Sequence, residues 1–325
     1  MSRPTSSPAL SVIVPMRNVE RYAGDMLTSL VRNVSEEVEF ILVDDGSTDR
    51  TPELVERFRP RLPRSQVIRH ERAAGLSGAR NAGMRVASGR YFTFLDGDDY
   101  VRPGYFGELA AAMDRLGCDY VKVDHIKVFG KRRVPDRAPM GLRDTPLKPR
   151  DGILPAHGRS MVDYPNAWSG AYRRELYESG VLLFDERLLT CEDRPWTWRL
   201  HLRAESYAVV SLWGPFYRRE VAGSLTRIGD ERQLHFFDAF DLVLGELARD
   251  PEGERFRTKA IRNYCAMIAF HLTERHRLSP PLQRRLRTRA RAAFSSFPAE
   301  NLAEVMPGLG PERERLLTEL LGVTP

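Results

Sequence analysis

Residues 91–100, YFTFLDGDDY, place three carboxylates within four residues, directly after an apolar and aromatic run. The run is typical of a buried strand, and Asp96, Asp98 and Asp99 follow its end. Carboxylates this close repel one another. A divalent cation that prefers oxygen ligands, Mg²⁺ or Mn²⁺, relieves the repulsion and leaves coordination positions for substrate phosphates. A lone D-x-D is by itself more often an acidic turn, here bent at Gly97, so the neighbouring segments must decide.

Upstream of this stretch, apolar runs alternate with segments of helical spacing. This rhythm predicts an α/β fold with an open, Rossmann-like, mainly parallel sheet and helices on both faces. Ligands of such sheets bind at the carboxyl ends of the strands, where the acidic motifs lie. The expected strands are 10–15, 38–43, 66–70 and the run beginning at residue 91, and the expected helices are 20–34, 51–58 and 79–87.

Downstream, the alternation continues to about residue 230 and then gives way to helices alone. We therefore expect a disordered lead at 1–9, an α/β domain at 10–230 and an α-helical C-terminal region at 231–325. The α/β part should contain helices at 105–116 and 192–204, a helical turn at 174–179, strands at 120–128, 166–172 and 207–217, and a basic loop or β-excursion at 130–155. The helical part should contain segments near 231–249, 254–277, 280–297 and 311–322.

The composition is that of an ordinary globular protein with a net positive charge. Hydrophobic residues make up 42% and charged residues 29%, and no run is long enough to span a bilayer. The N-terminal residues lack the apolar core of a secretory signal. The three cysteines, Cys118, Cys191 and Cys265, are far apart, which favours a reducing cytoplasm over a disulfide framework. The net charge of +6 suits acidic partners such as nucleotide phosphates, an anionic polymer or an anionic membrane.

Two segments near the carboxylates have the chemistry of a nucleotide site. Asp45 follows the second strand and could accept hydrogen bonds from a nucleobase N–H, although an aspartate at a helix N-terminus is an equally good explanation. Residues 75–83, GLSGARNAG, supply glycines and helix N-terminal N–H groups, and Arg80 is available for a diphosphate. A glycine-rich turn alone is a weak signal.

Taken together, the motifs resemble the inverting family 2 glycosyltransferases of the GT-A fold. The resemblance covers roughly residues 10–230, and it implies a nucleotide-binding half at about 10–128 and an acceptor half at about 129–230. One departure is Arg17, where many relatives carry an aromatic residue. The motifs are SVIVP with Asn18 (11–18), VDDGSTD (43–49), GARNAG (78–83) and FLDGDD (94–99).

The resemblance also implies roles for single residues on the donor side. Asp96 and Asp98 correspond to the D-x-D that contacts the ribose and the metal-bound diphosphate. Mn²⁺ or Mg²⁺ would be held at Asp98, with Asp96 and Asp99 nearby. The first motif and Asp45 would hold the nucleoside, usually uridine. The residues assigned to nucleotide binding are Pro15, Asn18, Asp45, Gly46, Ser47, Arg80, Asn81, Asp96, Arg218 and Ser224.

The catalytic base is expected in residues 190–196, TCEDRPW, which resemble the family's E-D motif. The resemblance assigns the role to Asp193, with Glu192 as the next candidate. Such a carboxylate is needed because an acceptor hydroxyl is a poor nucleophile until its proton is removed. In isolation, an acidic pair at a helix N-terminus would be the preferred explanation.

Residues 216–226, FYRREVAGSLT, resemble a segment near the end of many such bacterial domains. Arg218 or Arg219 could meet the diphosphate, and Ser224 and Thr226 could line the donor site. A purely structural turn is the alternative, and the sequence does not choose between the two.

The C-terminal region is strongly basic at residues 283–294, QRRLRTRARAAF. An arginine-rich helix with Leu282, Leu286 and Phe294 on one side could lie on an anionic membrane or bind an anionic polymer. A solvated helix face packed on the rest of the protein is the alternative. Nucleic acid is disfavoured because no array of stacking aromatic residues accompanies the charge.

The sequence therefore predicts a metal-dependent, inverting transferase that acts in the cytoplasm, with peripheral association at the inner face of the cell membrane left open. The donor would be a nucleotide sugar, most simply UDP-linked. The acceptor would be a hydroxyl of a bacterial surface glycan, a lipid-linked intermediate or an anionic wall polymer. A glycan-binding protein that lost turnover and a nucleotidyltransferase are the rival hypotheses, and the oligomeric state is open.

Overall fold

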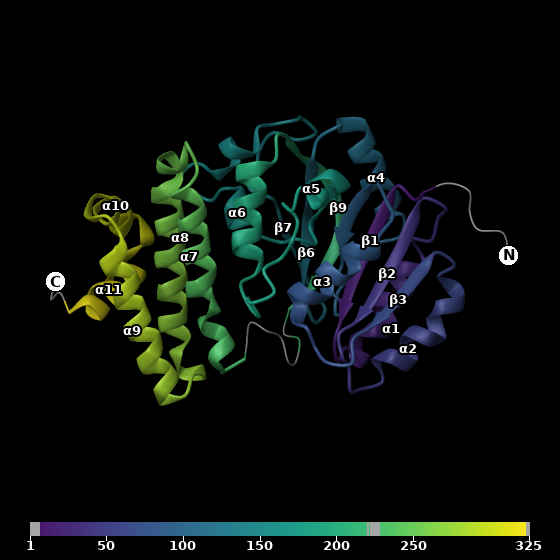
Figure 1. Ribbon diagram of the computed structural model, residues 1–325, viewed down its shortest axis with the longest axis horizontal. Coiled ribbons are helices and arrows are strands. Elements are labelled where there is room, and N and C mark those ends of the chain that lie inside the picture. Colours follow the sequence, from purple (N-terminus) through teal and green to yellow (C-terminus); the bar gives the residue numbers. More distant parts are fainter. Residues whose placement is uncertain (1–6, 220, 222–227, 323–325) are drawn as a thin grey trace.

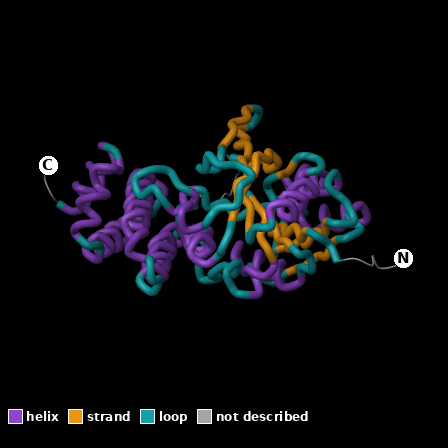
Figure 2. Tube along the Cα trace, turned by 90° about the horizontal axis from the view of Figure 1, so that it is seen from above, coloured by secondary structure: helices purple, strands orange, loops and turns teal. Residues whose placement is uncertain are grey.

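The computed structural model describes residues 7–219, 221 and 228–322. In Figure 1 the strands lie toward the N-terminal end, and α7, α8 and α9 stand side by side toward the C-terminal end. Seen from above, the half nearer the C-terminus is helical, whereas the strands gather in the other half (Figure 2).

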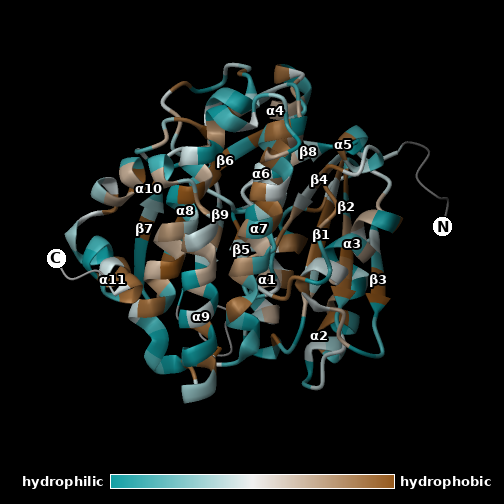
Figure 3. Cartoon of the chain, turned by 60° about the vertical axis from the view of Figure 1, so that its left-hand side comes forward, coloured by the Kyte–Doolittle hydropathy of each residue, from teal (hydrophilic) through white to brown (hydrophobic). Residues whose placement is uncertain are grey.

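The sheet is built from strands of two to twelve residues. Figure 3 shows that β1 and β2 are largely hydrophobic along their length, as buried central strands require. In the described part of the chain the strands are β1 (Leu10–Met16), β2 (Val38–Asp44), β3 (Ser65–Arg69), β4 (Tyr91–Phe94), β5 (Tyr100–Val101), β6 (Tyr120–Phe129), β7 (Arg132–Asp136), β8 (Gly170–Arg173) and β9 (Tyr207–Arg218).

The strand order is β3-β2-β1-β4-β8-β6-β9-β5, with β7 paired to β6. The first four strands in this order are parallel, as the sequence predicts. Beyond β4 the sheet is mixed: β8 is antiparallel to β4 and β6, β6 is parallel to β9, and β5 and β7 are antiparallel to their partners. The α/β class is confirmed, and the parallel character is concentrated in the N-terminal half.

Helices cover both faces of the sheet. Val12 and Val14 pack into the core under α1, α2 and α4, while Ile13 packs into the core under α3, α5 and α6, which is the alternation of a buried strand. Over the described ranges the helices are α1 (Glu20–Val31), α2 (Thr51–Phe58), α3 (Gly75–Val86), α4 (Tyr105–Leu116), α5 (Arg174–Glu178), α6 (Asp193–Arg203), α7 (His235–Leu247), α8 (Gly253–Thr273), α9 (Pro280–Ser296), α10 (Ala299–Val305) and α11 (Pro311–Leu321).

The helices after residue 230 have a core of their own and also pack on the sheet-bearing part. Trp198 and Leu202 of α6 share an apolar cluster with Val243 of α7 and Phe256 of α8. The short helix α10 was not anticipated from the sequence. No helix in the described ranges combines the length and apolar character that a membrane span requires.

The predicted disordered lead, residues 1–9, includes residues that are folded. Residues 1–6 lie outside the described residues. Ala9 is buried and its N–H donates to Glu37 O at 2.8 Å, while Arg90 N–H donates to Pro8 O at 3.3 Å. Pro8 and Ala9 therefore belong to the folded part.

Candidate active site

The loops after β1 and β2 are hydrogen-bonded to each other at the carboxyl edge of the sheet. Thr48 N–H donates to Asn18 Oδ1 at 2.8 Å, and Asn18 N–H donates to Ser47 Oγ at 3.0 Å. The loop after β4 joins them, since Gly97 N–H donates to Pro15 O at 3.1 Å. A Cβ on Gly97 would lie 3.1 Å from that same oxygen, so the D-G-D motif needs glycine for close approach. The first, second and fourth motifs thus form one loop cluster.

Asp45 lies in this cluster, with both carboxylate oxygens already engaged. Oδ1 accepts from Ala74 N–H at 2.7 Å and lies 2.7 Å from His70 Nδ1, and Oδ2 accepts from Gly75 N–H at 2.9 Å. Gly46 follows with φ 69°, in the left-handed region. Asp45 therefore fastens the start of α3 to the end of β2, and a nucleobase would have to share its remaining acceptor capacity.

Arg80 is buried at the centre of the site and links two acidic motifs. One terminal nitrogen donates to Asp96 Oδ1 at 2.9 Å, and the other donates to Glu192 Oε1 at 3.0 Å. The guanidinium also lies over the rings of Phe184 and Phe94, at 5.1 and 5.8 Å from their centroids. Sequence reasoning made Arg80 available for a diphosphate. The structure instead gives both terminal nitrogens carboxylate partners.

Asn81, the next residue of α3, is also engaged within the protein. Its Nδ2 donates to Phe184 O and to Glu186 Oε1, both at 2.9 Å, and its Oδ1 accepts from Phe184 N–H at 3.0 Å. Ser77 Oγ donates to Leu188 O at 3.2 Å. Helix α3 therefore holds the segment that leads into the E-D motif, a positioning function that the sequence did not reveal.

The three carboxylates of the D-G-D-D motif lie in different surroundings. Asp96 is partly exposed and pairs with Arg80. Burial, with a contribution from Asp96, raises the pKa of Asp98 to about 6. Asp99 is almost fully buried, and burial together with Asp98 and Asp96 raises its pKa well above the ordinary value. Its Oδ1 accepts from Arg218 N–H at 2.6 Å, so Asp99 holds the end of β9 and is a weaker candidate ligand than expected.

The surroundings of Asp98 and Asp96 suit a divalent cation. Within residues 7–219, 221 and 228–322, no cluster of three or more His, Cys, Asp or Glu side chains is arranged to enclose a metal. Mg²⁺ sites commonly use one or two carboxylates plus substrate phosphates rather than an all-protein cage. Burial, with a smaller contribution from the charge of Asp96, raises the pKa of Asp98, and a bound cation would stabilise its charged form against both effects. The donor set therefore fits a metal that binds together with a diphosphate.

Glu192 and Asp193 stand at the start of α6. Glu192 is buried, and burial raises its pKa to about 7, an effect that Arg80 offsets only in part. Asp193 keeps 31% of its side chain exposed, and the nearest cation in the described structure is Arg194 Nε at 3.9 Å. Burial by the surrounding protein raises the pKa of Asp193, too. Asp193 is thus the less constrained of the two carboxylates and the better candidate for accepting a proton.

The helical C-terminal region holds the E-D loop from the other side. Leu189 N–H donates to His235 Nδ1 at 3.0 Å, and Thr190 Oγ1 donates to Arg232 O at 2.5 Å. Cys191, with φ 58°, packs against the core of the helical region. The sequence motifs did not predict these contacts, because the contacting residues are more than 40 positions apart and meet only in the folded chain.

Arg218 closes the site beside β5. Its guanidinium donates to Asp98 O at 2.7 Å and to Asp25 Oδ2 at 2.6 Å, and lies 4.7 Å from the ring centroid of Tyr100. Arg218 thus fixes the D-G-D-D backbone. Ser224 and Thr226, predicted to line the donor site, lie outside the described residues.

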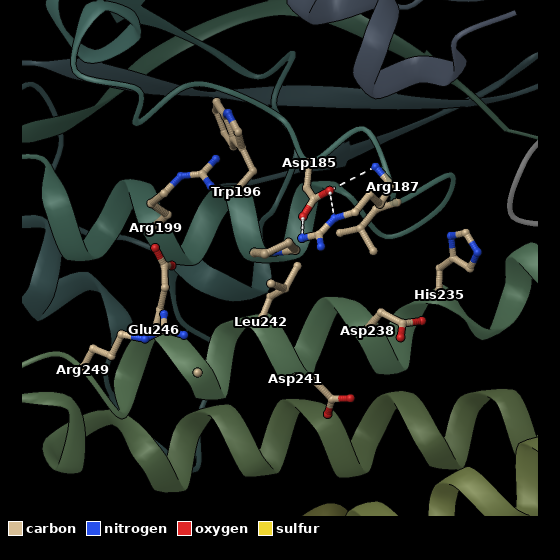
Figure 4. A pocket seen from close by; sticks show the side chains of 13 residues that line it. Asp185, Arg187, Trp196, Arg199, His235, Asp238, Asp241, Leu242, Glu246 and Arg249 are labelled. Atoms are coloured by element: carbon tan, nitrogen blue, oxygen red, sulfur yellow. Dashed lines mark hydrogen bonds and ion pairs between the residues drawn. The ribbon is translucent and has the colours of Figure 1, made fainter.

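A separate cleft of about 700 Å³ lies between α6, α7 and the segment before the E-D motif (Figure 4). Its walls carry both charges, including Arg199, Glu246 and the ion pair of Asp185 with Arg187. Neither Asp193 nor the D-G-D-D carboxylates line it. The cleft is therefore distinct from the carboxylate site.

Comparison with known proteins assigns the family. The model described as "Glycosyl transferase family 2" matches residues 11–177, just over half of the chain. The chain belongs to glycosyltransferase family 2. The match covers the nucleoside, glycine-rich and D-G-D-D motifs, and the E-D motif follows it.

Two bacterial glycosyltransferases illustrate the similarity to curated proteins. Over 223 residues the chain is 36% identical to the glycosyltransferase EpsJ of Bacillus subtilis, which covers 68% of this chain and 64% of EpsJ. Over 239 residues it is 28% identical to the poly(ribitol-phosphate) β-N-acetylglucosaminyltransferase TarS of Staphylococcus aureus, covering 73% of this chain and 40% of TarS. The chain thus spans less than two thirds of the length of these relatives.

Solved structures share the GT-A fold. The structure of TarS 1–349 with UDP-GlcNAc superposes with a TM-score of 0.77 at 22% identity, covering 97% of this chain and 90% of that one. The mannosyltransferase PcManGT of Pyrobaculum calidifontis, with GDP-Man and Mn²⁺, gives 0.54 at 16% identity, covering 98% and 87%. The TarS similarity extends through the C-terminal helices, so these helices belong to a shared architecture.

Proposed function

We propose that this chain is a metal-dependent, inverting glycosyltransferase that moves a sugar from a UDP-linked donor to a hydroxyl group of a bacterial surface glycan, lipid-linked intermediate or wall polymer. The observation that carries the proposal is Arg80, because its two ion pairs bring the D-x-D carboxylate Asp96 and the E-D carboxylate Glu192 to one guanidinium. A donor-side motif and a candidate base thereby share one site in a family 2 chain.

The proposed reaction is a single displacement at the anomeric carbon. Asp193 accepts the proton of the acceptor hydroxyl as its oxygen attacks, and the bond to the diphosphate breaks on the opposite face, which inverts the configuration. Arg80 holds Glu192 and Asp96 in place. Mn²⁺ or Mg²⁺, held at Asp98 and Asp96 with the donor, would offset the negative charge on the departing diphosphate.

The choice of donor and acceptor rests on the relatives. TarS is solved with UDP-GlcNAc and is named for transfer to poly(ribitol-phosphate), which supports a UDP-linked donor and a wall-polymer acceptor. The three cysteines are free, which agrees with action in the cytoplasm. Peripheral contact with an anionic membrane through α9 would rest on its exposed arginines alone, because Leu286 and Phe294, the expected apolar side, are buried in the core of the C-terminal helices.

The test is nucleotide release from a donor panel of UDP-GlcNAc, UDP-glucose, UDP-galactose and GDP-mannose, with Mn²⁺, with Mg²⁺ and with excess EDTA. We expect release from one UDP-linked donor, loss of release in EDTA, and a decrease of orders of magnitude in the near-isosteric variant Asp98→Asn. Full activity in EDTA would contradict metal dependence. Binding of a donor without any release by the folded protein would favour the non-catalytic rival.

A further inference from the structure

The hairpin formed by the end of β6 and β7, residues 127–137, carries a concentration of positive charge beside the candidate active site. It contains five basic residues and one acidic residue, a net charge of +4 (5 − 1). We propose that this basic hairpin binds an anionic acceptor polymer that carries phosphate groups along its length. The proposal rests on the proposed glycosyltransferase function and names the acceptor class for that site.

The hairpin is bonded directly to the D-G-D-D segment. Arg133 of β7 donates to the hydroxyl of Tyr100 at 3.2 Å, and Tyr100 directly follows Asp99. On the other side, Arg219 N–H donates to Val128 O at 2.8 Å. A polymer held along the hairpin would therefore pass next to the carboxylate site rather than on a remote surface.

The outer charges of the hairpin are available for a ligand. Asp136, its one acidic residue, is occupied by Lys127 Nζ at 2.6 Å and by Arg159 at 2.9 Å. Lys131, Arg132 and Arg137 are exposed, and in the described structure none of them lies within 4.0 Å of a carboxylate. Arg132 lies over the Phe129 ring at 4.8 Å from its centroid, a contact that leaves its N–H groups free of carboxylates. Cations without carboxylate partners suit repeated phosphates, which arginine binds through its planar fork.

The hairpin lacks the features that a membrane surface would need. The large apolar residues that are exposed in the described chain are Val34, Val86, Leu142, Leu183, Leu189, Phe270 and Leu321, and none lies in 127–137. A peripheral membrane site usually combines charge with an apolar anchor. Charged residues on an edge strand also prevent pairing with other chains, and that role alone predicts no polymer binding.

The experiment uses the full chain and long-chain inorganic polyphosphate as the probe, with binding measured over a range of salt concentrations. The hairpin variant is Lys131→Gln, Arg132→Gln and Arg137→Gln. The matched control removes three exposed charges from the helical region, as Arg284→Gln, Arg287→Gln and Arg313→Gln. We expect the hairpin variant to bind at least tenfold more weakly with a shallower salt dependence, as when charge contacts to a polyanion are lost. The control should stay within about twofold of the parent.

Three outcomes would overturn the inference: no loss in the hairpin variant, an equal loss in both variants, or a loss of binding to anionic phosphatidylglycerol vesicles in the hairpin variant that exceeds its loss of polyphosphate binding. Circular dichroism confirms that each variant is folded. UDP-GlcNAc binding by the parent is measured in the same preparation. A parent that binds polyphosphate through the hairpin but neither binds nor cleaves any nucleotide sugar contradicts the proposed function alone.

Discussion

At the scale of single residues, Arg80 is the buried cation that pairs with the carboxylates of the candidate site. Its buried guanidinium meets Asp96 and Glu192, and Asp193 adds a further negative charge nearby. Even so, burial keeps the pKa of Glu192 raised. The single charge of Arg80 therefore does not balance the three carboxylates Asp96, Glu192 and Asp193. We expect the pair formed by Glu192 and Asp193 to titrate within the working pH range.

The titration of Glu192 and Asp193 should determine how the rate of nucleotide release changes on the acidic side of its pH profile. The base must be deprotonated, so nucleotide release should rise with pH and level off above the pair's upper pKa, near the value of about 7 for Glu192. The charge of Asp193 contributes to the raised pKa of Glu192, and repulsion between two carboxylates is mutual. Glu192→Gln removes that repulsion from Asp193, so the acidic limb should move to lower pH. An unchanged limb in Glu192→Gln would show that the two carboxylates are not coupled.

Metal binding needs a separate control, because the pKa of Asp98 is also raised, to about 6. The pH profile is therefore measured at two metal concentrations tenfold apart. An acidic limb that shifts with metal concentration reports Asp98 instead.

The raised pKa of Glu192 also determines how the stability of the folded protein changes with pH. The folded state binds this proton more tightly, so its contribution is present below the ordinary pKa of 4.5 and is lost as pH rises through about 7.

At the scale of elements, the loop before α6 depends on the helical region. Thr190 is buried and donates its hydroxyl proton to Arg232 O. Thr190→Val keeps the shape and removes the hydroxyl donor. Arg232 O keeps the backbone N–H of His235, so the loss should cost about 1 kcal/mol of stability. Because the loop carries Asp193, we also expect kcat to fall by roughly tenfold while donor KM stays within twofold.

The control for this prediction is Thr273→Val, which removes a threonine-to-carbonyl bond within one helix at an exposed position, Thr273 Oγ1 to Ala269 O at 3.1 Å, at the end of α8. Steady-state kinetics and melting curves are recorded for both variants. If Thr190→Val and Thr273→Val change kcat equally, the loop bond does not position the base.

The same scale shows which elements the sequence could predict. Helices 51–58 and 105–116 have the predicted bounds. The spacing of their apolar residues and the helix-breaking residues at their ends are local signals that specify these bounds. Helix α3 begins at Gly75 rather than at residue 79, since the Asp45 carboxylate receives the N–H groups of Ala74 and Gly75. That interaction joins residues 30 apart and leaves no local signal.

In the candidate site, too, local motifs could be predicted from the sequence whereas contacts between distant residues could not. The sequence and its family resemblance identified the motifs, but not what their side chains contact. Arg80 was visible as a cation, whereas its partner Glu192 lies 112 residues away along the chain. The hydrogen bonds of Asn81 to Phe184, 103 residues away, were equally hidden. Contacts between distant segments depend on packing, which periodicity cannot report.

At the scale of the whole molecule, the basic C-terminal region is more strongly tied to the protein than its sequence suggests. Arg285 pairs with Glu231, Arg289 pairs with Asp238, and Arg291 Nε donates to Leu320 O. Several charges of α9 therefore serve internal packing. Arg284 and Arg287 are exposed, so membrane contact through this helix rests mainly on those two side chains.

The central claim is that Asp193 removes the acceptor proton in a sugar transfer. The most direct test is the rate of nucleotide release by Asp193→Asn with the best donor, alongside donor affinity measured by calorimetry. We predict unchanged affinity and a loss of about 10²- to 10⁴-fold in rate, as expected when a general base is removed. A folded Asp193→Asn variant that releases nucleotide at the parental rate would contradict the account and move the role to Glu192.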